Sequence, residues 1–277
     1  MIYKFNNLKY DLSSRTFVMG ILNITPDSFS DGGKYFDKDI QMQRIVVDAV
    51  RMEREGADFI DVGGESTRPG AQKVSADEEI QRVIPVISEI MKHINIPISI
   101  DTYKHQVAEE ALKAGAVIVN DISGFQFDDK IAAVTKKYNA SCILMHIKGT
   151  PKEMQNNPVY ENVIEEIKDY LSVSISIAKQ AGIKQIIVDP GIGFGKTFAH
   201  NIEIIKKLNE FKSFGYPVLL GFSKKRFINE IYESNIDERN EGTLSANTVG
   251  ILNGANIIRV HDVLENKRAA LTADALK

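Results

Sequence analysis

Short apolar runs alternate with longer amphipathic stretches along the whole chain. Eight of the runs are rich in isoleucine and valine and often continuously apolar, which is typical of strands covered on both faces. They predict strands at 16–24, 58–63, 97–101, 116–120, 140–146, 185–189, 217–222 and 256–260. The amphipathic stretches predict helices near 40–56, 76–94, 104–114, 128–138, 159–182, 199–212, 243–253 and 262–275, with a short extra helix at 224–232.

Strands that alternate with helices along the chain pair in parallel. Eight such units in 277 residues favour a closed (β/α)8 barrel, the TIM-barrel architecture, with the strands inside and the helices outside. A doubly wound open sheet is the alternative. No linker or repeat interrupts the alternation, so residues 1–277 are predicted to form a single α/β domain. The residues before Thr16 fall outside the pattern and are expected to form a hairpin that caps the bottom of the barrel.

Composition narrows the possible partners and compartment. The formal net charge is −3, so we expect no general affinity for nucleic acid or anionic lipid. No apolar run reaches the ~18 residues of a membrane helix, and the N-terminus lacks the apolar segment of a signal peptide. Cys142 is the only cysteine and lies in an apolar run, which predicts a buried structural thiol and a reducing compartment. We therefore expect a cytoplasmic protein with no membrane partner.

Polar residues stand where the predicted strands end. In a barrel, the C-terminal strand ends form the active-site face. A single Asp or Asn there is commonly only a helix cap or turn residue, and Asp121 and Asp262 are open to that interpretation. Polar chemistry at nearly every strand end instead predicts a site. Asp101, Asn120 and Asp189 offer carboxylate and amide groups that could hold a flat heterocycle with several N–H and C=O groups.

Basic residues gather around the same predicted face. Lys224, Lys225 and Arg226 open the short helix, whose N-terminus already carries partial positive charge, so an anion is expected there. A solvated basic turn is the alternative. Lys225 could also compensate buried carboxylates. Further positive charge at other strand ends is expected from Arg68, Arg259 and His261. A locally basic mouth on an acidic protein predicts an anionic, phosphorylated substrate.

The loops contain no standard nucleotide-binding motif. Pro190 stands where a phosphate loop requires glycine, and Lys196 stands at the last glycine of a dinucleotide-binding pattern. Residues 189–197 are therefore interpreted as a flexible loop that walls the pocket with Phe194. Two polar, glycine-bearing loops, around Phe29 and Arg68, are interpreted as lids, with surface turns as the alternative. The five histidines show no zinc spacing, whereas a Mg²⁺ held partly by substrate phosphate would leave almost no mark.

The motifs together resemble dihydropteroate synthases, enzymes of the folate pathway. The matching stretches follow in order over almost the whole chain, at 20–33, 61–71, 100–102, 119–124, 145–146, 189–196, 221–226 and 259–262. The resemblance implies that 4-aminobenzoate is joined to 6-hydroxymethyl-7,8-dihydropterin diphosphate with release of pyrophosphate. It also implies a Mg²⁺ cofactor and a homodimer, with no nucleic-acid partner. No protein nucleophile is needed for this chemistry.

The resemblance also implies roles for individual residues. Asn23 would contact Mg²⁺ and the diphosphate. The catalytic set would be Asp101, Lys225, Arg259 and His261. The pterin would be held by Asp101, Asn120, Asp189 and Lys225, beside Met145, and the diphosphate by Arg259 and His261. The second-substrate loop would supply Thr67 and Arg68, and the aminobenzoate pocket would be lined by Phe29, Pro69 and Phe194.

One position departs from the family pattern. Arg226 occupies the place where the family usually has a small hydroxyl residue, which points to Arg226 as a contact for the aminobenzoate carboxylate. Two alternatives remain open. A methyltetrahydrofolate-dependent methyltransferase shares the pterin barrel but would not need the loop around Phe29 or the Lys225 motif. A non-catalytic pterin-binding protein would be expected to lack part of the basic cluster.

Overall fold

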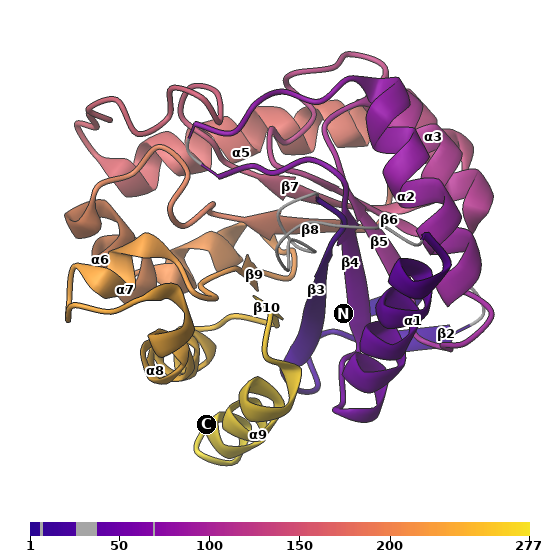
Figure 1. The fold of residues 1–277 in the computed structure, drawn as a ribbon. Coiled ribbons are helices and arrows are strands. Elements are labelled where there is room, and N and C mark those ends of the chain that lie inside the picture. Colours follow the sequence, from indigo (N-terminus) through magenta and orange to yellow (C-terminus); the bar gives the residue numbers. More distant parts are fainter. Residues whose placement is uncertain (6–7, 26–37, 69) are drawn as a thin grey trace.

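A parallel sheet of eight strands closes into a barrel (Figure 1). The computed structural model describes residues 1–5, 8–25, 38–68 and 70–277. The barrel strands are β3 (Phe17–Asn23), β4 (Phe59–Gly63), β5 (Ile98–Asp101), β6 (Ile118–Asp121), β7 (Ser141–Met145), β8 (Ile186–Asp189), β9 (Leu219–Leu220) and β10 (Ile257–Val260). Their spatial order is β8-β7-β6-β5-β4-β3-β10-β9, and a parallel bridge between Val188 and Val218 joins the two ends. The predicted (β/α)8 barrel is therefore confirmed.

Helices surround the barrel and follow its strands (Figure 1). They are α1 (Lys38–Arg54), α2 (Ala76–Ile90), α3 (His105–Ala114), α4 (Ile131–Lys137), α5 (Val163–Gln180), α6 (Phe198–Lys206), α7 (Arg226–Asn229), α8 (Asn240–Leu252) and α9 (Val263–Ala275), with 3₁₀ turns at η2 (Leu208–Phe214) and η3 (Ile236–Glu238). No helix in the described ranges combines the length and apolar character that crossing a membrane requires.

Some element ends differ from the predicted ones for identifiable reasons. The helix predicted from 159 begins at Val163, because the Asn162 side chain accepts hydrogen bonds from the first free backbone N–H groups. The predicted strand 217–222 is divided where the two ends of the sheet, β8 and β9, meet. The Pro217 carbonyl accepts a hydrogen bond from Val188 N, whereas the next residues pair with β10, so only Leu219–Leu220 remain as β9.

Strand residues alternate between two apolar layers, as a two-residue period requires. One set, which includes Val18, Ile60 and Cys142, packs outward against the helices. Cys142 is fully buried, so the predicted structural thiol is confirmed, and burial raises the pKa of that thiol. The other set, which includes Phe17 and Phe59, points into the barrel. Continuing the alternation along each strand therefore brings specific residues to the inner face of the mouth.

A hairpin caps the lower end of the barrel, as predicted. Strands β1 (Ile2–Phe5) and β2 (Leu8–Asp11) pair antiparallel. Tyr3, Phe5 and Leu12 are buried against inward-facing residues from the starts of the barrel strands. The Tyr3 hydroxyl donates a 2.6 Å hydrogen bond to the Ile186 carbonyl. The lower end is therefore filled with apolar side chains, while the polar inward residues lie at the opposite end.

Candidate active site

The inner face of the mouth collects most of the predicted site residues. Gly63 pairs with both Asn23 and Asp101 in the parallel register, and Asp101 pairs in turn with Asn120. Met145 of β7 pairs with Asp189 at the end of β8. The inward positions at the strand ends are Asn23, Asp61, Gly63, Asp101, Asn120, Met145, Asp189 and Arg259. The fold thus places polar groups from six different strands around one opening.

Arg259 is the centre of the polar cluster. Its Nε donates to Asp61 Oδ2 at 2.6 Å, and its Nη2 donates to Asp101 Oδ2 at 2.7 Å. Asn120 Nδ2 donates to the same Asp61 oxygen at 2.9 Å. The sequence offered Lys225 as a cation that could compensate buried carboxylates. In the structure, Arg259 of β10 reaches past β3 to bind Asp61 and Asp101, while the Lys225 charge favours the ionised form of Asp189.

Asp61 was not singled out from the sequence, although it lies inside a quoted motif. It is fully buried, and its Oδ1 has no hydrogen-bond partner among the described residues; the same holds for Ser99 Oγ beside it in the sheet. Unpaired buried polar atoms are costly unless a ligand satisfies them. Burial raises the pKa of Asp101 to about 7, against the opposing effect of Arg259, and the Asp61 charge adds to the rise. The floor of the mouth is therefore suited to a polar ligand.

Asp189 and Lys225 form one wall of the mouth with Phe194. Asp189 Oδ1 accepts a 2.7 Å hydrogen bond from Gly191 N, and burial raises the pKa of its carboxyl. Lys225 Nζ donates to the Ile192 carbonyl and lies 4.5 Å from the centre of the Phe194 ring. Burial lowers the pKa of Lys225 to about 8, although the Asp189 charge opposes the shift. A cation, an anion and an aromatic face thus share this wall.

Lys196 holds the loop that carries Phe194. Its buried Nζ lies 2.8 Å from both His146 Nδ1 and the Gly191 carbonyl oxygen, and 3.0 Å from the Phe194 carbonyl oxygen. Burial lowers the pKa of Lys196 well below its ordinary value. The glycines of this segment predict a flexible loop, but the lysine ties it from inside. Neither Lys196 nor its His146 partner was assigned this role from the sequence.

His261 faces the mouth in a neutral form. Its Nδ1 lies 2.8 Å from Ser223 Oγ, which also accepts a hydrogen bond from the His261 backbone. Burial, together with the charges of Arg259, Lys224 and Arg68, lowers the pKa of His261 to about 4. The expected positive charge on this side chain is therefore absent near pH 7.

The three consecutive cations after β9 do not share one anion site. Lys224 Nζ lies 3.0 Å from Asp262 Oδ2, Lys225 faces the mouth, and Arg226 is exposed. The helix they were expected to open spans four residues, α7, rather than 224–232. A single turn aligns few peptide dipoles, so the helix contributes little to anion binding. The expected anion site at this helix start is therefore not assembled by the three side chains together.

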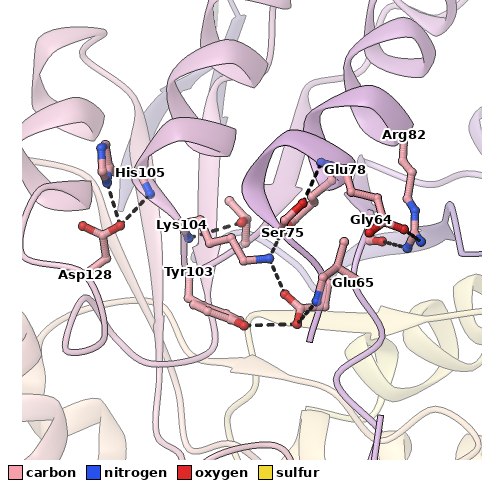
Figure 2. A network of polar contacts seen from close by, with 12 residues as sticks. Gly64, Glu65, Ser75, Glu78, Arg82, Tyr103, Lys104, His105 and Asp128 are labelled. Carbon is pink, nitrogen blue, oxygen red and sulfur yellow. Dashed lines mark hydrogen bonds and ion pairs between the residues drawn. The ribbon is translucent and has the colours of Figure 1, made fainter. Parts of the chain in front are cut away.

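The loop after β4 carries the remaining predicted residues. Thr67 is half-buried and Arg68 is exposed, while Pro69 and Phe29 lie outside the described residues. At the base of this loop, Glu65 contacts Lys104 and Tyr103 in a network that also reaches Glu78, Arg82 and His105 (Figure 2). Met145 belongs to a small apolar cluster at the mouth, against which Phe194 packs.

A barrel whose mouth presents carboxylates, an amide and a buried guanidinium defines an enzyme for a polar heterocycle. In agreement, the family model for pterin-binding enzymes matches residues 19–261. Dihydropteroate synthase of Clostridium beijerinckii is 48% identical over 276 residues, which cover 99% of this chain and 98% of the relative.

Solved structures agree with the sequence comparison. Dihydropteroate synthase of Clostridium difficile, crystallised in the presence of pteroic acid, superposes with a TM-score of 0.90 at 47% identity and covers 96% of this chain and 98% of its own. The Xanthomonas albilineans enzyme with 4-aminobenzoic acid gives a TM-score of 0.91 at 36% identity, with coverages of 99% and 97%. The chain therefore belongs to the dihydropteroate synthases, folate-synthesis enzymes within the pterin-binding enzyme family.

Proposed function

We propose that the mouth of the barrel joins 4-aminobenzoate to 6-hydroxymethyl-7,8-dihydropterin diphosphate and releases pyrophosphate. The observation that carries this assignment is the cluster of Asp61, Asp101 and Asn120 around Arg259. It offers both donors and acceptors to a flat heterocycle on the inner face of the mouth. Membership of the dihydropteroate synthases supports the same reaction.

The pterin ring is assigned to the inner wall of the mouth. Asp101, Asn120 and Asp189 supply acceptors and a donor for its N–H and C=O groups. Lys225 supplies a cation from the wall that it forms with Asp189 and Phe194. Met145 contributes an apolar contact. A site built to hydrogen-bond a heterocycle rejects analogues that leave its buried groups unpaired.

Bond breaking places negative charge on the leaving diphosphate. The bond between the pterin methylene carbon and the diphosphate oxygen breaks, and the electron pair leaves with the oxygen. Arg259 is positioned to stabilise this charge, and His261 to donate a hydrogen bond. Anionic Asp101 would stabilise the pterin cation that remains. The amine nitrogen of aminobenzoate then bonds to the methylene carbon and releases a proton.

The second substrate is assigned to the outer part of the mouth. Phe194 provides an aromatic face, and the loop after β4 brings Thr67 and the exposed cation Arg68 to the rim. The roles proposed for Phe29 and Pro69 in this pocket rest on the family resemblance. Homodimer assembly and a cytoplasmic location also belong to the proposal, since the structure describes a single chain.

Asn23 fits a Mg²⁺ site shared with the substrate diphosphate. A methyl group placed on Gly63 would lie 3.6 Å from Asn23 Oδ1 and 3.7 Å from Asp101 Oδ2, so the missing side chain leaves space beside the Asn23 oxygen. No group of three His, Cys, Asp or Glu side chains suited to a metal occurs in the described ranges. This fits a magnesium ion held by few protein oxygens and by phosphate. When bound, the ion would neutralise diphosphate charge.

Asn23→Ala is expected to raise the Mg²⁺ concentration for half-maximal activity roughly tenfold, because one of few protein oxygens is lost. Binding of a pterin without diphosphate should stay unchanged. The measurement is a Mg²⁺ titration of turnover, with pterin affinity measured separately by calorimetry. The exposed Asn95, changed to alanine, is the control. A titration that matches the parent would remove Asn23 from the metal site.

Arg226→Ser is expected to raise the aminobenzoate KM by roughly tenfold to a hundredfold, because a charge-assisted hydrogen bond to a carboxylate is worth about 1–3 kcal/mol. The pterin KM should change little. Steady-state kinetics with both substrates varied, on Arg226→Ser and Arg226→Ala, provide the check. If both variants stay within about twofold of the parent KM, the exposed side chain only faces solvent.

A turnover assay tests the function directly. The purified protein is given the diphosphate ester, 4-aminobenzoate and Mg²⁺, and pyrophosphate and dihydropteroate are both measured. Equal amounts of the two products are expected. A methyltransferase would instead transfer a methyl group from methyltetrahydrofolate, and a pterin-binding protein without activity would bind the ester unchanged. Either outcome would overturn the proposal.

A further inference from the structure

We propose that Lys104 is a positioning residue for the second substrate. Its ammonium group fixes the base of the loop that follows β4, and this loop carries Thr67 and Arg68. The inference rests on the proposed function of that loop in binding 4-aminobenzoate. Lys104 itself lies just after β5 and is assigned no contact with either substrate.

One ammonium group holds two carboxylates from different elements. Lys104 Nζ lies 2.5 Å from Glu65 Oε2 in the loop after β4 and 2.5 Å from Glu79 Oε2 in α2. Figure 2 shows the lysine reaching across from the end of β5 toward Glu65. The loop and the helix are thus joined through a third element.

The three side chains of this ion-pair group are buried, so the two carboxylates need the positive charge of Lys104. The exposed fractions of the Lys104, Glu65 and Glu79 side chains are 10%, 9% and 1%. Within the described part of the chain, neither carboxylate forms an ion pair with another cation. Burial raises the pKa of Glu79, while the Lys104 charge opposes the shift. Without Lys104, two buried carboxylates would face each other uncompensated.

The Glu65 carboxylate connects the two ends of the loop. Its Oε2 binds Lys104, and its Oε1 accepts hydrogen bonds from Val74 N at 3.2 Å and from the Tyr103 hydroxyl at 3.1 Å. Residue 65 opens the loop and residue 74 closes it. A second tie runs from Arg82 Nη1 to the Gly64 carbonyl oxygen, at 2.8 Å. The Glu65 carboxylate therefore joins both ends of the segment that carries Thr67 and Arg68, and Arg82 adds a second contact at its start.

Stability alone does not account for this arrangement. A buried ion pair is often no more stabilising than apolar side chains of similar volume, because both charges lose their hydration. Here the charges fix one orientation of Glu65, which then selects the position of both loop ends. A displacement of about 1 Å at a substrate-positioning group can lower the rate a hundredfold. A rigid base below an exposed Arg68 is consistent with such a requirement.

The test uses Lys104→Met. The double variant Lys104→Met/Glu79→Gln, in which only one carboxylate remains uncompensated, is included in case the single variant folds poorly. Tyr103→Phe is a milder change that removes one hydrogen bond to Glu65. The matched control is Lys113→Met, which breaks a surface ion pair with Glu110. Steady-state kinetics give the KM of each substrate, and hydrogen exchange reports on the backbone of residues 66–74.

In the Lys104 variants we expect the aminobenzoate KM to rise about tenfold while the pterin ester KM stays within twofold. Amides of residues 66–74 should exchange faster, whereas those of the barrel strands should not. Tyr103→Phe should act in the same direction with a smaller effect, and Lys113→Met should match the parent. Unchanged loop exchange with an unchanged aminobenzoate KM would overturn the inference. If the parent itself makes no dihydropteroate, the proposed function fails, and the exchange data alone still decide whether Lys104 fixes the loop.

Discussion

Asp101→Asn is expected to lower kcat by about 10²- to 10³-fold, the loss typical when one preorganised electrostatic group is removed. The substitution keeps the size of the side chain, removes its charge and replaces one acceptor oxygen by an NH2 donor. That charge is needed to stabilise the developing pterin cation. The measurement is kcat and KM for both substrates at saturating Mg²⁺. Near-normal kcat/KM in this variant would contradict the assignment of the site.

The same variant should unfold at the parent temperature or above it. Burial disfavours the ionised form of Asp101, so a neutral amide avoids a cost that the parent carries. Asp128→Asn is a suitable contrast. Its carboxylate accepts hydrogen bonds from the His105 backbone and ring, at 2.9 and 2.7 Å, outside the mouth. That variant should lose thermal stability and keep its kcat, which is the opposite pattern.

Arg259→Met is expected to abolish measurable turnover and to lower the free energy of unfolding by about 3–5 kcal/mol. The guanidinium is the shared partner of Asp61 and Asp101, and its loss leaves both carboxylates without their cation. The leaving diphosphate loses its stabilising charge at the same time. Urea unfolding and kcat/KM together give both effects.

A double variant separates the two roles of Arg259. Adding Asp61→Asn to Arg259→Met removes one buried charge and should recover much of the lost stability without restoring turnover. Arg15→Met is the control, because Arg15 also binds a carboxylate through two nitrogens, in Asp58, but far from the mouth. Asp58 keeps Lys267 at 3.2 Å and should therefore tolerate the change better. An Arg259→Met protein as stable as the parent would refute the pairing argument.

The barrel and most of its mouth could be predicted from the sequence. Apolar runs bounded by polar residues locate all eight strands, and the C-terminal strand ends place Asp101, Asn120, Asp189 and Arg259 at the same face of the barrel. The two-residue period explains this success, since it places alternate residues of every strand on the inner face.

The partners of the charged groups could not be predicted in the same way. Lys225 could have compensated the carboxylates, but Arg259 binds Asp61, 198 residues away, by reaching from β10 past the intervening strand β3. Lys104 lies 39 residues from Glu65 and 25 from Glu79, and nothing in the local pattern connects them. Such pairings depend on how helices and loops pack on the barrel, which local hydrophobic periodicity does not encode.

The hairpin below the barrel limits how substrates can enter the site and how products can leave it. Among the described residues, Tyr3, Phe5 and Leu12 fill the lower end of the barrel with apolar side chains, which leaves the opening at the strand ends as the route into the interior. Both reactants must arrive, and pyrophosphate and dihydropteroate must depart, through the opening formed by the strand ends. With the pterin on the inner wall and aminobenzoate in the outer part of the mouth, as proposed above, the pterin ester is expected to enter first. Substrates and products therefore share one passage, and both products must leave it before the next pair of substrates can enter.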